Sequence, residues 1–125
     1  MNEKSKTAFY VPVKRYDLWM ADIPETPKTH VQQGFRPVLV VSNDMANKYS
    51  PVITVVPLTS QLNKHQLPTH VLLQDQGLGK NSLALCEQIL TLDKSSLKRR
   101  VGFVYKEFDR LAICHALAVQ LGMVA

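Results

Sequence analysis

Two short runs of β-branched and aliphatic residues constrain the fold of this chain more than any other feature. They occupy residues 37–42 (PVLVVS) and 51–58 (PVITVVPL), and each has the length of a strand. The first is near-continuously apolar, which predicts a strand buried on both faces. The second carries Pro57 near its end, and proline cannot donate to a strand ladder, so this strand is expected to be bulged or at a sheet edge.

Weaker patterns predict the remaining elements. Further strands are expected at residues 16–22, 69–74, 82–92 and 99–104. A helix is expected at residues 106–121, because apolar residues recur there at helical spacing, and Gly122 follows where a helix-ending glycine belongs. The predicted apolar stripe of this helix consists of Phe108, Leu111, Ala112, His115, Ala118 and Val119. We expect it to be buried against a sheet or against a second copy of the chain.

Five or six short strands followed by one helix favour a mainly β fold. A compact, strongly bent antiparallel sheet or a small barrel with helices at its ends fits this order. The length of 125 residues corresponds to a single domain. Residues 1–15 are interpreted as a polar N-terminal tail and residues 16–125 as the folded domain.

Composition restricts the compartment and the partners. The net charge of +5 is compatible with an anionic partner such as nucleic acid, but does not establish one. No apolar run reaches about 18 residues, so no membrane span is expected. Cys86 and Cys114 lie in apolar runs without C-x-x-C spacing, which indicates reduced thiols in the cytoplasm and predicts no zinc site.

Two polar segments flank the apolar runs and are the main candidates for a functional site. Residues 32–37 (QQGFRP) place Arg36 at the mouth of the first run, and residues 57–61 (PLTSQ) place Thr59, Ser60 and Gln61 at the end of the second. If the two strands are neighbours, these segments meet. One cation and adjacent hydroxyls would then bind a phosphodiester without a metal. The alternatives are an arginine that supports its loop and hydroxyls that cap a turn.

The remaining polar residues are less informative. His30, in the long loop at residues 23–35, is a candidate proton carrier. His65 and His70 are expected to be exposed to solvent, and His115 to lie in the core or at an interface. The basic run at residues 98–100 is either solvated surface or a contact for an RNA backbone.

Taken together, the motifs resemble a known family. Their order is G-F-R-P-V-L-V-V-S-N from Gly34, P-L-T-S-Q from Pro57, and E-Q-I-L-T-L-D from Glu87. This combination resembles the MazF/PemK (Kid) toxin endoribonucleases of bacterial toxin–antitoxin pairs, over roughly residues 16–122. The resemblance implies an SH3-like, CcdB-like small β-barrel with a C-terminal helix, which forms a homodimer in the bacterial cytoplasm.

The resemblance also implies an activity: cleavage of single-stranded RNA, commonly mRNA, at a short sequence. No metal or other cofactor is implied. The 2′-hydroxyl attacks the adjacent phosphate, which leaves a 2′,3′-cyclic phosphate and a 5′-hydroxyl. Arg36 and Thr59 fall on the family's catalytic positions. The residues expected to bind RNA or support the transition state are Gln33, Gly34, Ser60, Gln61, His30, Glu87 and Gln88.

Several alternatives stay open at this point. The general base could be His30, a backbone carbonyl or a neighbouring phosphate oxygen. Glu87 and Leu90 depart from the aspartate and arginine common in the family, so no recognised base sequence carries over. The expected protein partner is a short antitoxin with an acidic, disordered segment. Competing functions are a gyrase poison of the CcdB type and a catalytically inactive relative that only binds the antitoxin.

Overall fold

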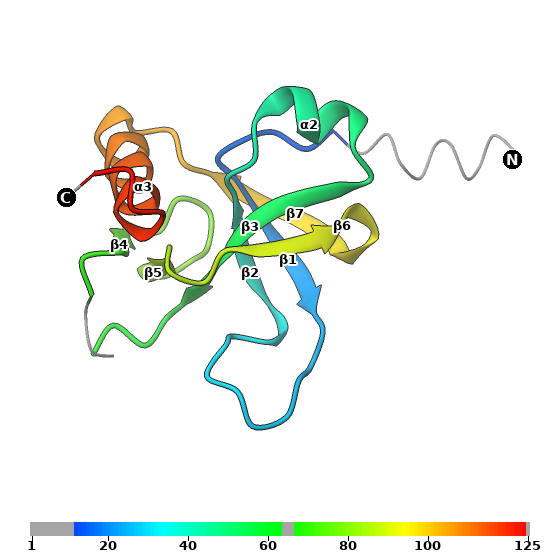
Figure 1. Ribbon diagram of the computed structural model, residues 1–125, viewed down its shortest axis with the longest axis horizontal. Coiled ribbons are helices and arrows are strands. Elements are labelled where there is room, and N and C mark those ends of the chain that lie inside the picture. Colours follow the sequence, from blue (N-terminus) through cyan, green and yellow to red (C-terminus); the bar gives the residue numbers. More distant parts are fainter. Residues whose placement is uncertain (1–11, 64–66, 125) are drawn as a thin grey trace, which may run out of the picture.

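The computed structural model describes residues 12–63 and 67–124, which form seven strands, two α-helices and one 3₁₀ turn (Figure 1). The elements are β1 (Asp17–Ile23), β2 (Gly34–Val40), α2 (Asp44–Tyr49), β3 (Val52–Thr59), β4 (His70–Leu73), β5 (Ser82–Leu85), β6 (Leu90–Asp93), η1 (Lys94–Ser96), β7 (Leu97–Phe103) and α3 (Glu107–Gln120). The predicted mainly β fold with a C-terminal helix is confirmed.

All strand pairs are antiparallel, in the order β4-β5-β3-β2-β1-β7. β3 pairs with three strands: β2 lies on one side, and on the other side β6 pairs with its first half and β5 with its end. The sheet therefore bends along β3. Its end strands, β4 and β7, do not pair with each other in the described chain, so the sheet is coiled but not closed.

Pro57 lies where β3 changes neighbours. It pairs with Val38 of β2, whereas on the opposite side β6 reaches only Val55 and β5 begins only at Leu58. A missing N–H group costs no ladder bond at such a gap. Pro57 was expected at a bulge or at a sheet edge; β3 has partners on both sides, so it is not an edge strand, and Pro57 instead lies at the gap between two of those partners.

The strand predicted over residues 82–92 is two strands. β5 ends at Leu85, and a turn leads to β6 at Leu90. In that turn the Cys86 amide donates to the Thr69 carbonyl (3.1 Å) and the Gln88 amide donates to the Leu85 carbonyl (2.9 Å). The break lets β5 pair with the end of β3 and β6 with its start. The local pattern of apolar residues could not predict this break.

Apolar side chains are buried on both faces of the central strands, as predicted for residues 37–42. One core contains Leu18, Leu39 and Val56, and the other contains Trp19 and Val38. Successive residues along β1 and β2 thus alternate between two cores, which explains why the apolar run is continuous. Val13 (4% exposed) packs into the second core, whereas residues 1–11 of the predicted tail lie outside the described residues.

Helix α3 is present as predicted. Of its predicted buried stripe, Ala112 packs against the core and Ala118 and Val119 are half-buried in the single chain. Ile113 and Ala116 pack against the sheet, while Phe108 is 81% and Leu111 61% exposed. The helix is apolar nearly all round, so periodicity could not select which face is buried. His115 is also exposed in the single chain, so it does not lie in the core, and its alternative place at an interface stays a prediction.

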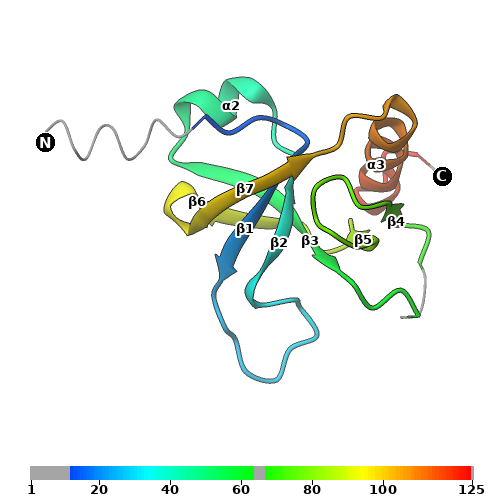
Figure 2. The same ribbon diagram turned by 180° about the vertical axis from the view of Figure 1, so that it is seen from behind.

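The end of α3 follows the predicted glycine signal. Gly122 has φ +71°, its amide donates to the Val119 carbonyl (3.1 Å), and the Met123 amide donates to the Ala118 carbonyl (2.8 Å). This is the Schellman pattern. α3 lies beside β4, as the view from behind also shows (Figure 2). In the described part of the chain, no helix has the length and apolarity needed to cross a membrane.

Candidate active site

The pairing of β2 with β3 brings the two polar segments together. Because Val38 pairs with Pro57, the start of β2 lies beside the end of β3. A cavity of about 350 Å³ opens at this point. Its lining residues are Met20, Arg36, Pro37, Leu58, Thr59, Ser60, Gln61, Leu78, Lys80 and Ser82. The structure therefore brings Arg36 and the Thr59 segment to the same end of two neighbouring strands, as the sequence predicted.

The chemical character of this cavity suits an anion. Its lining includes two cationic residues, Arg36 and Lys80, and no carboxylate among the residues described there. Hydroxyl groups come from Thr59, Ser60 and Ser82. Cations and hydroxyl donors without a competing acid are the groups that bind a phosphate or phosphodiester.

Thr59 is nearly buried, with 7% of its surface exposed, and its orientation is set locally. Its Oγ1 accepts a hydrogen bond from the Gln61 amide (3.2 Å), which is the turn-capping contact considered from the sequence. Since the oxygen accepts this bond, its own O–H proton remains a donor for another group. Capping and anion binding are therefore compatible roles.

Arg36 is held by its own loop. Its Nε donates to the Gln33 carbonyl (2.9 Å) and its Nη1 donates to Oε1 of Gln32. A guanidinium has five N–H groups, so these two bonds orient it and leave three for a ligand. Gln33 is itself fixed, because its Oε1 accepts from the Thr26 amide. Gly34 opens β2 with φ +86°, a conformation that favours glycine.

Sequence reasoning missed Lys80 and Ser82. They enter the cavity because β5 pairs with the end of β3, where Thr59 lies opposite Leu83. The turn before β5 is pressed against β7: a Cβ on Gly102 would lie 2.1 Å from the Gln76 carbonyl oxygen. The glycines at 77 and 79 signalled a turn, but nothing local indicated which strand that turn would approach.

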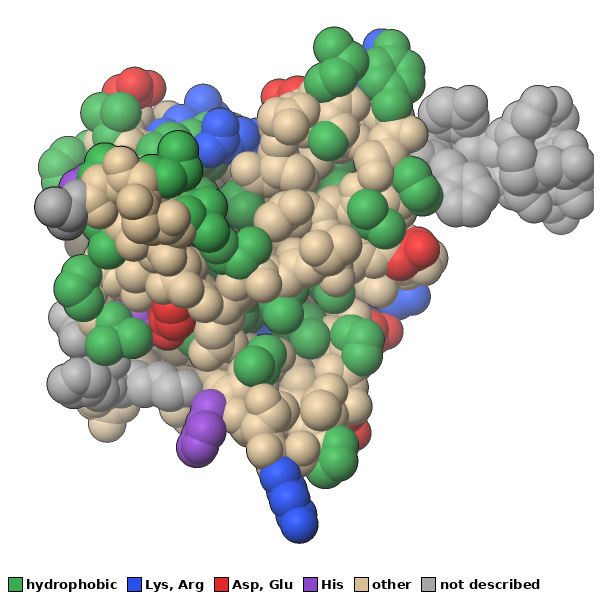
Figure 3. Space-filling view, viewed as in Figure 1, with side chains coloured by type: hydrophobic (Ala, Val, Ile, Leu, Met, Phe, Trp, Pro, Cys, Tyr) green, Lys and Arg blue, Asp and Glu red, His purple; other side chains and the backbone are tan. Residues whose placement is uncertain are grey.

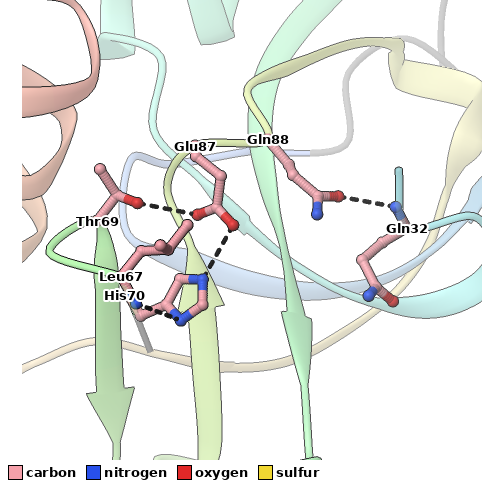
Figure 4. Close-up of polar contacts among 6 residues, drawn as sticks. All are labelled: Gln32, Leu67, Thr69, His70, Glu87 and Gln88. Carbon is pink, nitrogen blue, oxygen red and sulfur yellow. Dashed lines mark hydrogen bonds and ion pairs between the residues drawn. The ribbon is translucent and has the colours of Figure 1, made fainter. Parts of the chain in front are cut away.

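Glu87 and Gln88 do not line the cavity; they diverge from the turn between β5 and β6 (Figure 4). Glu87 accepts hydrogen bonds from Oγ1 of Thr69 (3.1 Å) and Nε2 of His70 (2.9 Å). The Gln88 side-chain oxygen accepts from the Gln32 amide (2.7 Å). Glu87 and Gln88, expected from the resemblance to help bind RNA, therefore contact other protein groups in this structure.

The histidines differ from expectation. The His70 side chain is only 4% exposed, so its predicted exposure was wrong; burial is stabilised by the bond to Glu87. His70 Nδ1 accepts from the Leu67 amide (3.3 Å), which assigns the ring proton to Nε2. His30 is exposed in the loop and is not part of the cavity lining. His65 lies outside the described residues.

Neither a reactive thiol nor a metal cluster accompanies the described site. Cys86 is fully buried in the core that contains Leu18 and Leu39, outside the cavity lining, and burial, reinforced by the negative charge of Glu87, raises the pKa of this thiol to about 12. It is therefore protonated at neutral pH and does not act as a nucleophile. Residues 12–63 and 67–124 contain no group of three His, Cys, Asp or Glu side chains that could hold a metal ion.

Comparison with known proteins shows the family to which this fold belongs. Residues 14–121 match the family described as PemK-like, MazF-like toxin of type II toxin–antitoxin system. The endoribonuclease MazF of Staphylococcus epidermidis is 38% identical over 113 residues, which cover 89% of this chain and 92% of that protein.

Two solved structures agree. MazF from Deinococcus radiodurans is 26% identical with a TM-score of 0.73, covering 91% of this chain and 99% of that one. An endoribonuclease from a mycobacterial species, solved in complex with its cognate antitoxin, is 25% identical with a TM-score of 0.74, covering 90% and 98%. The family match at residues 14–121 spans all seven strands of the described chain. The chain therefore belongs to the PemK-like, MazF-like toxin family of type II toxin–antitoxin systems, the family of the endoribonuclease MazF.

Proposed function

We propose that this protein is an endoribonuclease toxin of the bacterial cytoplasm that cleaves single-stranded RNA at a short sequence without a metal ion. The observation that carries the proposal is the cavity that joins Arg36, Thr59 and Lys80 with no carboxylate in its lining. A phosphodiester fits this set of groups, because a cation and hydroxyl donors can surround its non-bridging oxygens. Similarity to the endoribonuclease MazF of Staphylococcus epidermidis supports the same activity.

The proposed reaction is an internal transesterification. The ribose 2′-oxygen forms a bond to the adjacent phosphorus as the bond from phosphorus to the 5′-oxygen breaks. The 2′-hydroxyl loses its proton and the leaving 5′-oxygen gains one, giving a 2′,3′-cyclic phosphate and a 5′-hydroxyl. Negative charge grows on the non-bridging oxygens in the transition state. The guanidinium of Arg36 and the hydroxyl of Thr59 stabilise that charge by donating hydrogen bonds.

Arg36 and Lys80 contribute positive charge to the reaction. A guanidinium has N–H donors and no acceptor, so Arg36 donates hydrogen bonds to the phosphate and is not the base that takes the 2′-hydroxyl proton. The histidines that the structure describes lie outside the cavity lining, so none of them is positioned there to act as the base. Lys80 adds a second positive charge for the bound phosphate.

The proposal includes a homodimer. Exposed apolar side chains gather on the α3 side of the molecule (Figure 3). They include Phe108, Leu111, Leu121 and Met123, which are 61–81% exposed. A single chain leaves this surface in water at a cost of about 25 cal/mol per Å², and a second copy of the chain would cover it.

Cleavage of RNA by the purified protein in EDTA tests the proposal. We expect single-stranded RNA to be cut at a recurring short sequence, with 2′,3′-cyclic phosphate and 5′-hydroxyl termini, as read by end-specific ligation and sequencing. Intact RNA together with trapped DNA cleavage complexes would instead identify a gyrase poison. Binding of an antitoxin without cleavage of any RNA would identify an inactive relative.

The proposal also predicts how an antitoxin inhibits. An acidic segment would occupy the cationic cavity that takes RNA, as an antitoxin accompanies the mycobacterial relative. We expect bound antitoxin to exclude RNA. Binding of the antitoxin should weaken as salt is added, because salt screens the attraction between its acidic segment and the cationic cavity. A gel-shift titration with labelled, uncleavable RNA measures this. A ternary complex that retains RNA in the cavity would contradict the prediction.

A further inference from the structure

The loop at residues 24–33, which joins β1 and β2, projects away from the body of the molecule (Figure 1). Near its end it is tied to a distant part of the chain. The side-chain oxygen of Gln88 accepts a hydrogen bond from the backbone N–H of Gln32 at 2.7 Å, across 56 residues of sequence. The loop's other hydrogen bonds, in the part of the chain described, lie within itself or go to Arg36. Gln88 is thus its external anchor.

The anchored residue is the one that holds Arg36. The Gln32 side chain accepts from Nη1 of Arg36, and the next carbonyl, that of Gln33, accepts from Nε at 2.9 Å. Two adjacent loop residues therefore fix both the plane and the direction of the guanidinium. Any shift of the loop backbone at Gln32 moves these acceptors, and Arg36 moves with them.

Gln88 is in turn held by the framework. Its neighbour Glu87 accepts from Thr69 and His70, at 3.1 Å and 2.9 Å, on the β4 side of the turn (Figure 4). The Cys86 amide donates to the Thr69 carbonyl at 3.1 Å. The turn between β5 and β6 therefore cannot drift with the loop. A continuous series of bonds leads from β4 through this turn to Arg36.

We propose that Gln88 is a positioning residue, which sets the orientation of Arg36 for RNA cleavage by holding the loop backbone at Gln32. The proposal rests on the proposed function and gives Gln88 a role other than direct RNA contact. It makes a chemical distinction. Anchoring needs only an acceptor atom at position 88, because the partner is a backbone N–H, whereas an RNA contact through the amide nitrogen would need a donor.

Two substitutions separate these roles. Gln88→Leu keeps the approximate size and removes the acceptor; Gln88→Glu keeps an acceptor and removes the donor. We expect Gln88→Leu to lower kcat by about 10- to 100-fold with little change in KM, since a small misplacement of a catalytic group costs that much. Gln88→Glu should retain most of kcat, with a higher KM because its charge repels RNA. Gln74→Leu, at an exposed glutamine after β4, is the matched control.

A coupling measurement adds a readout that general destabilisation would not reproduce. In an Arg36→Lys background, where the bidentate guanidinium is already lost, Gln88→Leu should have little additional effect on kcat. Equal loss in both backgrounds would overturn the proposal. So would a Gln88→Glu variant as slow as Gln88→Leu, or full activity of Gln88→Leu. If Gln88→Leu does not fold, Gln88→Ala takes its place as the acceptor-free variant.

The positioning can also be measured without cleavage. In the intact protein, the Gln32 amide should exchange with solvent faster in Gln88→Leu than in wild type or Gln88→Glu. The NMR signal of Nε–H in Arg36 should shift in the same variant only. If wild type cuts no RNA but these signals change, the proposed function fails and the anchoring stands. If wild type cuts RNA and the signals do not change, the anchoring fails alone.

Discussion

Arg36→Ala is expected to reduce RNA cleavage by about 100- to 1,000-fold, the loss typical of removing one preorganised donor to a developing oxyanion. Arg36 lines the cavity beside Thr59, and two bonds to its own loop hold its guanidinium before any ligand arrives. Its contribution grows as charge accumulates on the phosphorane-like transition state. We therefore expect the loss in kcat under single-turnover conditions, with a smaller change in RNA affinity.

The control is Lys48→Ala, which removes one positive charge from an exposed position on α2, outside the cavity. Both variants lower the net charge of the chain by one. A difference between their cleavage rates therefore reports where the lost charge lay, since the amount of charge lost is the same. Circular dichroism and thermal melting confirm that each variant is folded. Cleavage by Arg36→Ala at the rate of Lys48→Ala would show that Arg36 does not act at the reacting phosphate.

Gly102→Ala is expected to lower the free energy of unfolding by about 3 kcal/mol, the upper end for forcing atoms into a packed site. A Cβ at this position would lie 2.1 Å from the Gln76 carbonyl oxygen and 3.1 Å from the Cα of Gly77. Both neighbours are backbone atoms, which cannot rotate away as a side chain can. The turn that carries Leu78 and Lys80 into the cavity must therefore move off β7, so cleavage should fall as well.

Gly79→Ala is the matched control. A Cβ there meets no atom within 4 Å, and the only cost is its φ of +79°. That cost is about 1 kcal/mol. Urea denaturation followed by Trp19 fluorescence measures both variants, since Trp19 is 5% exposed in the second core and becomes solvated on unfolding. Equal losses in the two variants would show that the approach of the turn to β7 does not limit stability.

Much of the fold followed from local sequence signals, and the exceptions share a cause. The β-branched runs predicted β2 and β3, and Gly122 predicted the end of α3, because these signals act within a few residues. The break at residues 86–89 was not predicted, since it depends on the two partners that β3 takes. The face of α3 that packs on the sheet, with Ile113 and Ala116, was not predicted, because the helix is apolar nearly all round.

The candidate site shows the same division. Arg36 and Thr59 were identified from adjacent motifs, and their meeting required only that two successive strands be neighbours. Lys80 could not be identified, because it reaches the cavity through the pairing of β5 with β3 and the contact of its turn with β7. Gln88 was expected to touch RNA, yet its bond to Gln32 links segments 56 residues apart.

The sequence by itself determined which segments are extended, where the last helix ends, and which family the ordered motifs indicate. Only the tertiary structure decided which strands pair with β3, which face of α3 is buried, and what holds Arg36. The physical reason is one of range. Backbone preference and apolar periodicity depend on neighbours along the chain, whereas the choice of pairing partner and the orientation of a guanidinium depend on groups that meet only after folding.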